Sequence, residues 1–130
     1  MEEFPKPKPK IEKGPEDSVE QRFESSRKTL WEMVDQGVAE EERRKVIAEW
    51  QDREIARDEI EKEKPENKGI PRSVEEDLQY MVRVAQLYYA ADFLDDSWNG
   101  FQDALATAKE AKRDDLAVRI QKLIDELTSG

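Results

Sequence analysis

Three aspartates, Asp92, Asp95 and Asp96, form the acidic cluster that most resembles a metal site in this sequence. Carboxylate oxygens on a turn can hold a divalent cation such as Ca²⁺ or Mg²⁺. Acidic residues are also common at helix starts, where they accept hydrogen bonds from free backbone N–H groups and complement the helix dipole. We expect this second role here, with Asp95 or Asp96 capping a helix, and we predict no metal site.

Residue types that support catalysis are scarce in the chain. It contains neither Cys nor His, which excludes disulfides, thiolate and imidazole metal ligands and the usual general base near neutral pH. All-α nucleotide pyrophosphohydrolases hold Mg²⁺ with facing pairs of helical carboxylates. The other closely set acids here, at 40–42 and 75–77, lie near expected helix starts instead. We therefore expect no catalytic residue and no cofactor, and a metal-dependent hydrolase is the least favoured function.

Aromatic side chains are our candidates for contacts with a partner protein. They are Trp31, Trp50, Tyr80, Tyr89 and Trp98. The first two lie in an otherwise polar stretch, where aromatic residues are typical interface anchors. The two tyrosines are expected to point partly away from the helix face that carries Tyr88. Packing against a neighbouring helix is the alternative for all of these residues, so their exposure in the folded protein decides between the two roles.

Composition indicates a thin helical protein with one modest core. Of the 130 residues, 36% are hydrophobic and 42% are charged, and the net charge is −10. An acidic surface disfavours contact with a phosphate backbone, so we expect no direct nucleic-acid binding. Such a surface could attract a basic partner or mimic a nucleic acid, although keeping the protein in solution is its more general role. With no apolar run of membrane-spanning length and no secretory signal, we expect a cytoplasmic protein.

Turn signals divide the sequence into four parts. Residues 1–15 alternate Pro and Lys and predict a flexible, extended tail. Residues 16–64 predict two helices separated near Gly37, the second from about Glu40 to Lys64. Residues 65–72 contain two prolines and a glycine and form a linker. Residues 73–130 predict three helices, at 74–91, from Asp95 or Asp96 to 111, and across Leu116–Leu127, giving an all-α stack of about five helices.

Helix starts carry recognisable capping residues. Asp17 or Ser18 can accept the free N–H groups of the first helix. The sequence Ser73-Val74-Glu75-Glu76 reads as a capping box, in which Ser and the third following residue cap each other's backbone N–H groups. The second half of the second helix, beyond Trp50, has few apolar residues. We expect that half to be exposed to solvent or held by another chain.

Residues 78–111 resemble one tetratricopeptide repeat, a 34-residue helix–turn–helix. Met81, Val84, Ala85 and Tyr88 fill the first part of the pattern, and Ser97, Phe101, Ala104 and Leu105 fill the second. Small residues such as Ala85, Ser97 and Ala104 let the two helices approach closely. The chain departs from the pattern at Met81, where Trp is preferred, and at Lys109, where Pro is preferred. The resemblance implies a single repeat-like hairpin, followed by a helix like those that cap such arrays.

A lone repeat-like unit cannot bury all its faces, so the helices before Pro65 or a partner must cover the rest. We expect a non-enzymatic interaction module, such as an adaptor, assembly factor or small chaperone that binds another protein, with no cofactor and no membrane contact. Two other functions remain open. One is a structural subunit in which the first two helices complete a homo-oligomer. The other is an acidic inhibitor that mimics nucleic acid.

Overall fold

The computed structural model describes residues 18–71 and 73–128, which form five α-helices and no strand. The helices are α1 (Val19–Asp35), α2 (Glu40–Glu63), α3 (Val74–Ala90), α4 (Leu94–Glu110) and α5 (Asp114–Thr128). A short 3₁₀ turn, η2 (Pro65–Asn67), follows α2. The predicted all-α class with five helices is confirmed. The predicted tail, residues 1–15, lies outside the described residues.

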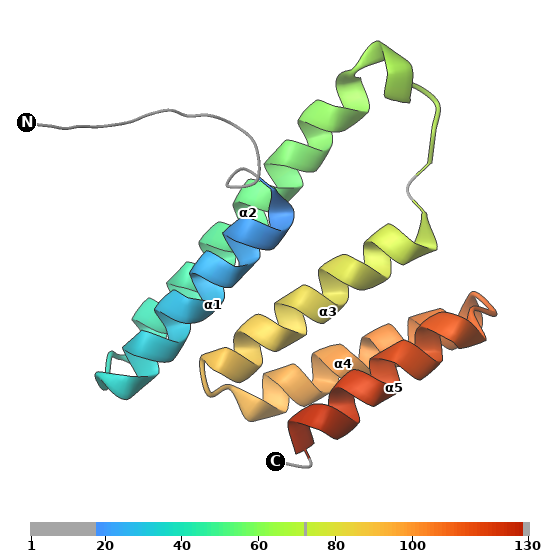
Figure 1. Cartoon of the computed structure of the whole chain (residues 1–130). Coiled ribbons are helices and arrows are strands. Elements are labelled where there is room, and N and C mark those ends of the chain that lie inside the picture. The colour runs from blue at the N-terminus through green and yellow to red at the C-terminus, as the bar shows by residue number, and fades with distance from the viewer. Residues whose placement is uncertain (1–17, 72, 129–130) are drawn as a thin grey trace, which may run out of the picture.

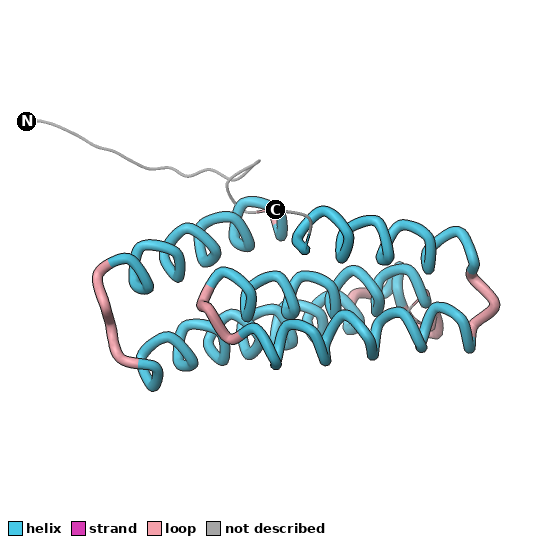
Figure 2. Tube along the Cα trace, turned by 90° about the horizontal axis from the view of Figure 1, so that it is seen from below, coloured by secondary structure: helices cyan, strands magenta, loops and turns pink. Residues whose placement is uncertain are grey.

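Helix α3 lies at the centre of the molecule, between α1 and α5 (Figure 1). Helix α2 lies behind α1, and α4 lies behind α5. Seen from below, α1 and α5 rise on the same side of α3, whereas α2 and α4 lie toward the other side (Figure 2). Successive helices run antiparallel. One face of the molecule is therefore formed by three helices that are not consecutive in the chain.

The capping predictions are confirmed at two helix starts and wrong at a third. The Ser18 hydroxyl accepts the N–H of Gln21, and Ser73 and Glu76 form both bonds of the capping box. Helix α4 begins at Leu94, and its N-cap residue, Phe93, lies two or three positions before the expected caps and makes no side-chain hydrogen bond. The chain reverses so tightly after Ala90 that Asp95 and Asp96 already lie inside the first turn of α4.

Three of the helix–helix turns share one geometry. Each contains a residue in the left-handed region: Gly37 (φ 72°), Asp92 (φ 69°) and Lys112 (φ 60°). In each, the N–H that follows this residue donates to a carbonyl five residues back, at 2.9 Å: Val38 to Met33, Phe93 to Tyr88 and Arg113 to Ala108. This is the Schellman ending of a helix, which satisfies carbonyls that would otherwise lack partners. The same turn thus joins α1 to α2, α3 to α4 and α4 to α5.

Small residues bring α3 and α4 into close contact, as expected. A Cβ atom built on Gly100 would lie 3.1 Å from the Cβ of Ala85. The buried Ser97 hydroxyl donates to the carbonyl of Ala85 at 2.8 Å. Phe101 fills the space beside these residues and is buried, whereas Tyr88 packs edge-on against Phe93, 6.2 Å between ring centroids. Small residues therefore set the closest approach of the two helices, and Phe101 fills the space beside it.

The core consists of two clusters that both draw on α3. The first joins α3, α4 and α5 and includes Leu78, Ala85, Phe101, Leu105 and Ile120. The second joins α1, α2 and α3 and includes Phe23, Leu30, Ile47, Trp50 and Leu87. Burial of such side chains contributes roughly 1.5–3 kcal/mol each. The N-terminal pair of helices is therefore held to the rest of the protein mainly through α3.

Polar contacts reinforce the position of α2. Arg22 of α1 forms two hydrogen bonds with the carboxylate of Glu54, at 2.6 and 3.0 Å. Arg43 donates to the carbonyl of Ala91, and Arg44 donates to Asp96 at 3.1 Å. Beyond Trp50, α2 exposes Ile55 and Ile60, in agreement with the expectation from its composition.

Candidate functional site

A groove runs along the face of α3 that lies between α1 and α5. It consists of three adjoining hollows of about 340, 80 and 330 Å³. The first and second hollows meet at Arg27 and Gln86, and the second and third meet at Tyr89 and Leu127. From Glu75 to Tyr89 it follows α3 for about 21 Å at 1.5 Å per residue. We call this feature the central groove.

The floor of the central groove is largely apolar. It is lined by Phe23 of α1, Leu78 and Val82 of α3, and Leu116, Ile120 and Leu123 of α5. Leu78 and Val82 are four residues apart and therefore lie on the same face of α3. Phe23, Leu78, Leu116 and Ile120 also belong to the core. The floor is therefore the outer surface of the packed core, and its shape is fixed by that packing.

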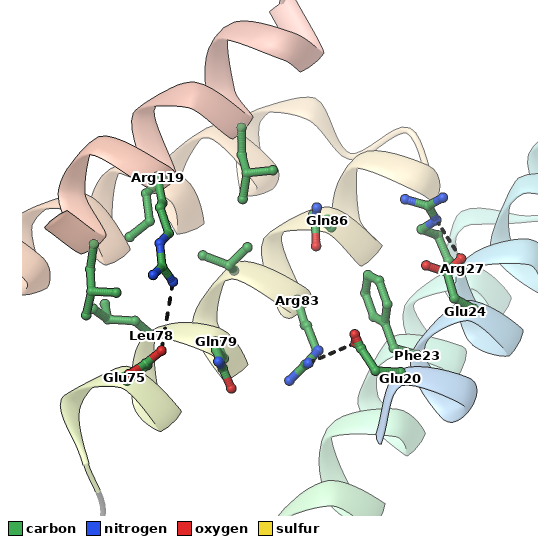
Figure 3. Close-up of a pocket in the computed structure, with 14 residues that line it drawn as sticks. Glu20, Phe23, Glu24, Arg27, Glu75, Leu78, Gln79, Arg83, Gln86 and Arg119 are labelled. Atoms are coloured by element: carbon green, nitrogen blue, oxygen red, sulfur yellow. Dashed lines mark hydrogen bonds and ion pairs between the residues drawn. The ribbon is translucent and has the colours of Figure 1, made fainter. Parts of the chain in front are cut away.

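Three Arg–Glu pairs border the first hollow, and all are drawn in Figure 3. Arg83 of α3 meets Glu20 of α1 at 3.1 Å, and Arg119 of α5 approaches Glu75 of α3 to 3.8 Å. The third pair, Arg27 and Glu24, lies within α1 at 3.4 Å. Exposed pairs of this kind contribute little stability, typically about 0–1 kcal/mol. They leave the rim polar and balanced in charge over an apolar floor.

One end of the central groove is aromatic and exposed. Trp31, Tyr89, Leu94 and Trp98 are 60%, 39%, 54% and 51% exposed. Trp31 and Tyr89 line the second hollow, and Tyr89, Leu94 and Trp98 line the third. The guanidinium of Arg27 lies 5.7 Å from the centre of the Trp31 ring. We call these four residues the aromatic end. Exposed apolar groups that are contiguous in this way mark interaction surfaces.

The structure brings together three of the five aromatic candidates and separates the other two. Trp31, Tyr89 and Trp98 come from different helices and meet at the aromatic end. Trp50 is fully buried, so its assignment as a partner contact is wrong. It packs edge-on against Phe23 and stacks on Tyr80, with ring centroids 5.8 Å apart. Tyr80 is half-buried above it, away from the central groove.

Several residues of the central groove were not expected from the sequence. Phe23, Val82, Arg83, Leu94 and Arg119 were not among the candidates, yet all lie in its floor, rim or aromatic end. The 3–4 spacing of apolar residues on α3 and α5 signals that these helices bury a face. That spacing does not reveal that α1 and α5 stand apart on either side of α3, because this separation depends on how the helices pack.

The acidic cluster near the start of α4 has a structural partner. Asp96 accepts a hydrogen bond from Arg44. This bond, together with a second that Arg44 donates to the Glu40 carboxylate, holds the pKa of the Arg44 guanidinium above its ordinary value. The same guanidinium lies 4.1 Å from the ring centre of Phe93. Across residues 18–71 and 73–128, no three side chains of the His, Cys, Asp or Glu type come together to hold a metal ion.

Comparison with known proteins gives no relative. No protein-family model matches the chain, and neither does any curated protein or solved structure. None of the helices in the described ranges has both the length and the apolar character needed to cross a membrane. The fold and the site together define an all-α protein with a groove that is walled by two helices.

Proposed function

We propose that the protein is a binding module whose central groove holds an amphipathic helix of another protein. The observation that carries this proposal is the aromatic end, an exposed apolar surface that opens onto an apolar floor between α1 and α5. Trp and Tyr are over-represented among the residues that dominate binding energy. The absence of Cys and His from the chain is in keeping with binding rather than catalysis.

The shape of the groove suits a helical occupant. Its floor follows α3 for about 21 Å, a length that about four turns of helix would fill. Two helices form its walls, as in other grooves that receive the apolar face of a helix through anchors at i, i+3, i+4 and i+7.

Acidic residues near the aromatic end favour a bound helix that carries basic residues beside its apolar face. Asp92 and Asp95 are exposed on either side of Leu94, at the aromatic end, and the whole chain carries a net charge of −10. A partner helix with Lys or Arg beside its apolar face would be attracted to this end and steered toward it. The chain's own first ten residues do not suit the role, because prolines at 5, 7 and 9 prevent a helix there.

Selection from a displayed library of 16-residue helical peptides tests the proposal. The full chain serves as bait, and the variant Gln86→Trp places bulk where the first two hollows meet. Val118→Trp adds the same bulk at an exposed position of α5 that lines none of the three hollows. Selected peptides should carry apolar residues at 3–4 spacing with basic flanks. They should bind Gln86→Trp and Trp98→Ala at least tenfold more weakly, and Val118→Trp unchanged.

Two results would contradict this function. If the peptides bind the Gln86→Trp variant as tightly as they bind the unchanged chain, they do not occupy the central groove. Selected peptides that lack the 3–4 apolar spacing, or that carry acidic flanks, would contradict the helical and basic character of the occupant. Circular dichroism of each variant confirms that its helices are intact, so that weaker binding is not loss of fold.

A structural subunit is the second candidate function, and the exposed Ile55 and Ile60 of α2 favour it. Both project from the part of α2 beyond Trp50, in which no residue is buried, so a second copy could cover them. Light scattering over a wide concentration range tests this function. A homo-oligomer should dissociate in the double variant Ile55→Glu/Ile60→Glu, whereas a mass that stays monomeric at every concentration rules it out.

A further inference from the structure

Three helices line the central groove, and they all run along it in the same direction. The first turn of each helix contributes to the first hollow, through Glu20, Glu75 and Leu116. The last two turns contribute to the second hollow, through Trp31, Tyr89 and Leu127. In Figure 1 all three helices accordingly run from right to left. The groove therefore has the N-terminal ends of α1, α3 and α5 at one end and their C-terminal ends at the aromatic end.

The common direction of these helices makes the two ends of the groove electrically different. Aligned peptide dipoles place roughly half a positive charge at the N-terminus of a helix and roughly half a negative charge at its C-terminus. Three C-terminal ends lie beside the aromatic end, so their partial negative charges add there. A bound helix whose N-terminus lies at this end brings opposite partial charges together. Helices α2 and α4 already have this orientation, because they run antiparallel to α3.

Carboxylates give the aromatic end a charge of the same sign. Asp35 follows Trp31 by one turn, on the same side of α1. Asp92 and Asp95 lie around the start of α4. All three carboxylates are exposed, and none has a cationic partner within residues 18–71 and 73–128. Lys28, one turn before Trp31, offsets one of the three charges, so a net negative charge remains.

The exposed rings of the aromatic end favour cations as well. Cations are attracted to the faces of aromatic rings, most strongly to those of Trp. The guanidinium of Arg27 already lies near the Trp31 ring. Trp98 and Tyr89 are exposed and have no such cation in the described part of the chain. Basic side chains of a bound helix can therefore contact rings and carboxylates at the same end.

The first hollow, at the other end of the groove, has no excess charge. Its lining carries three carboxylates and three guanidinium groups, which form the three Arg–Glu pairs described above. Between these pairs lies the apolar floor, which includes Leu78, Val82 and Ile120. This end therefore suits the apolar residues of an occupant and offers its basic residues no free carboxylate.

We propose that the bound helix runs antiparallel to α3, with basic residues in its N-terminal turn at the aromatic end and large apolar residues in the first hollow. This inference rests on the proposed function, because it concerns the occupant of the same groove. Val82 and Tyr89, which face the two ends, are seven residues apart on α3, or about 10 Å. In the partner's sequence, basic residues therefore come first and the apolar residues follow about two turns later.

Two synthetic helical peptides of the same composition test this order. In the basic-first peptide, lysines in the first turn precede the apolar residues by two turns, and the second peptide has the reversed sequence. Both are acetylated and amidated, so that terminal charges do not contribute. Lysine near a C-terminus stabilises an isolated helix, so intrinsic helicity favours the reversed peptide. The full chain should nevertheless bind the basic-first peptide about tenfold more tightly, as the sum of several small electrostatic contributions.

Neutral variants of the chain identify the carboxylates responsible. Asp35→Asn/Asp92→Asn/Asp95→Asn should weaken binding of the basic-first peptide about fivefold and leave the reversed peptide nearly unchanged. Asn tolerates the left-handed conformation of residue 92, so the turn is preserved. A matched triple variant removes the same charge at exposed positions outside the three hollows and should change neither affinity: Asp52→Asn/Asp103→Asn/Glu110→Gln. Equal losses in the two triple variants would overturn the inference.

A nitroxide on one end of the basic-first peptide measures its direction in the groove. A label at the peptide's N-terminus should broaden the amide signals of residues 31–35 and 89–95 severalfold more than those of residues 18–24 and 75–79. A label at its C-terminus should give the opposite result. Tight binding with the two patterns exchanged, or equal affinity for the two peptides, overturns this inference and leaves the proposed function standing. Binding that Gln86→Trp leaves unchanged, or no binding of either peptide, contradicts the proposed function itself.

Discussion

The hydroxyl of Ser97 on α4 donates a hydrogen bond to the backbone carbonyl of Ala85 on α3, at 2.8 Å and out of contact with water. This bond lies where the two helices approach most closely, beside Gly100. Ser97→Ala removes it without adding volume, so the free energy of unfolding should fall by about 0.5–1.5 kcal/mol. Urea denaturation checks this, with Ser25→Ala at an exposed position of α1 as the control. An unchanged midpoint in Ser97→Ala would contradict the assigned bond.

Trp50 is expected to stabilise the fold far more than the other two tryptophans. It projects from α2 and is fully buried against α1 and α3, whereas Trp31 and Trp98 are more than half exposed. Trp50→Ala should cost about 3–5 kcal/mol because it leaves a large cavity, and Trp31→Ala or Trp98→Ala should cost less than about 1 kcal/mol. Urea or thermal unfolding measures the difference. Equal losses in the three variants would show that Trp50 is not the core residue described above.

The start of α2 offers a stabilising substitution. Its N-cap residue, Ala39, makes no side-chain hydrogen bond, and Glu42 stands three residues later, as Glu76 does after Ser73. Ala39→Ser should create a second capping box and raise the free energy of unfolding by about 0.5–1 kcal/mol. The control, Ala48→Ser, places the same residue at an exposed position inside α2, where it should lower stability slightly. A loss of stability in both variants would contradict the capping geometry at Ala39.

Lys112 occupies the left-handed region at the α4–α5 turn, with φ 60°. A residue with a side chain is strained in this conformation by roughly 1–2 kcal/mol, and glycine is not. Lys112→Gly should therefore raise the free energy of unfolding by about 0.5–1 kcal/mol, as measured by thermal unfolding. Lys122→Gly, within α5, should instead lower it by about 1 kcal/mol. If both variants lose stability equally, the assigned turn at Lys112 is wrong.

Local features of the fold could be predicted from the sequence because they depend on neighbouring residues. Ser18, Gly37 and Ser73 mark helix ends through their own hydrogen bonds or backbone freedom, and the structure agrees at all three. The left-handed turns at Asp92 and Lys112 gave no such signal, since neither residue is glycine. There the antiparallel packing of the flanking helices enforces a backbone conformation that the residue itself disfavours.

The candidate site could be predicted only in part, for a related reason. Trp31, Tyr89 and Trp98 were candidates because they are aromatic, and all three meet at one end of the central groove. Trp50 lies in a polar stretch, as Trp31 does, but packs against Phe23 and Tyr80 in the interior. Its burial depends on contacts with residues distant in sequence, which a one-dimensional pattern does not contain. The groove itself arises from the placement of α1 and α5 and has no local signature.

Because α3 contributes to both core clusters, the covalent link between α2 and α3 is not what holds the two halves together. Leu87 and Ala90 of α3 pack with Leu30 and Trp50 of the preceding helices. A chain cut between Gly69 and Ile70 should therefore behave as a complementing pair, in which two separately produced fragments reassociate and recover the helical content of the intact protein. Calorimetric titration of one fragment with the other would measure directly how strongly the first two helices recognise the remaining three.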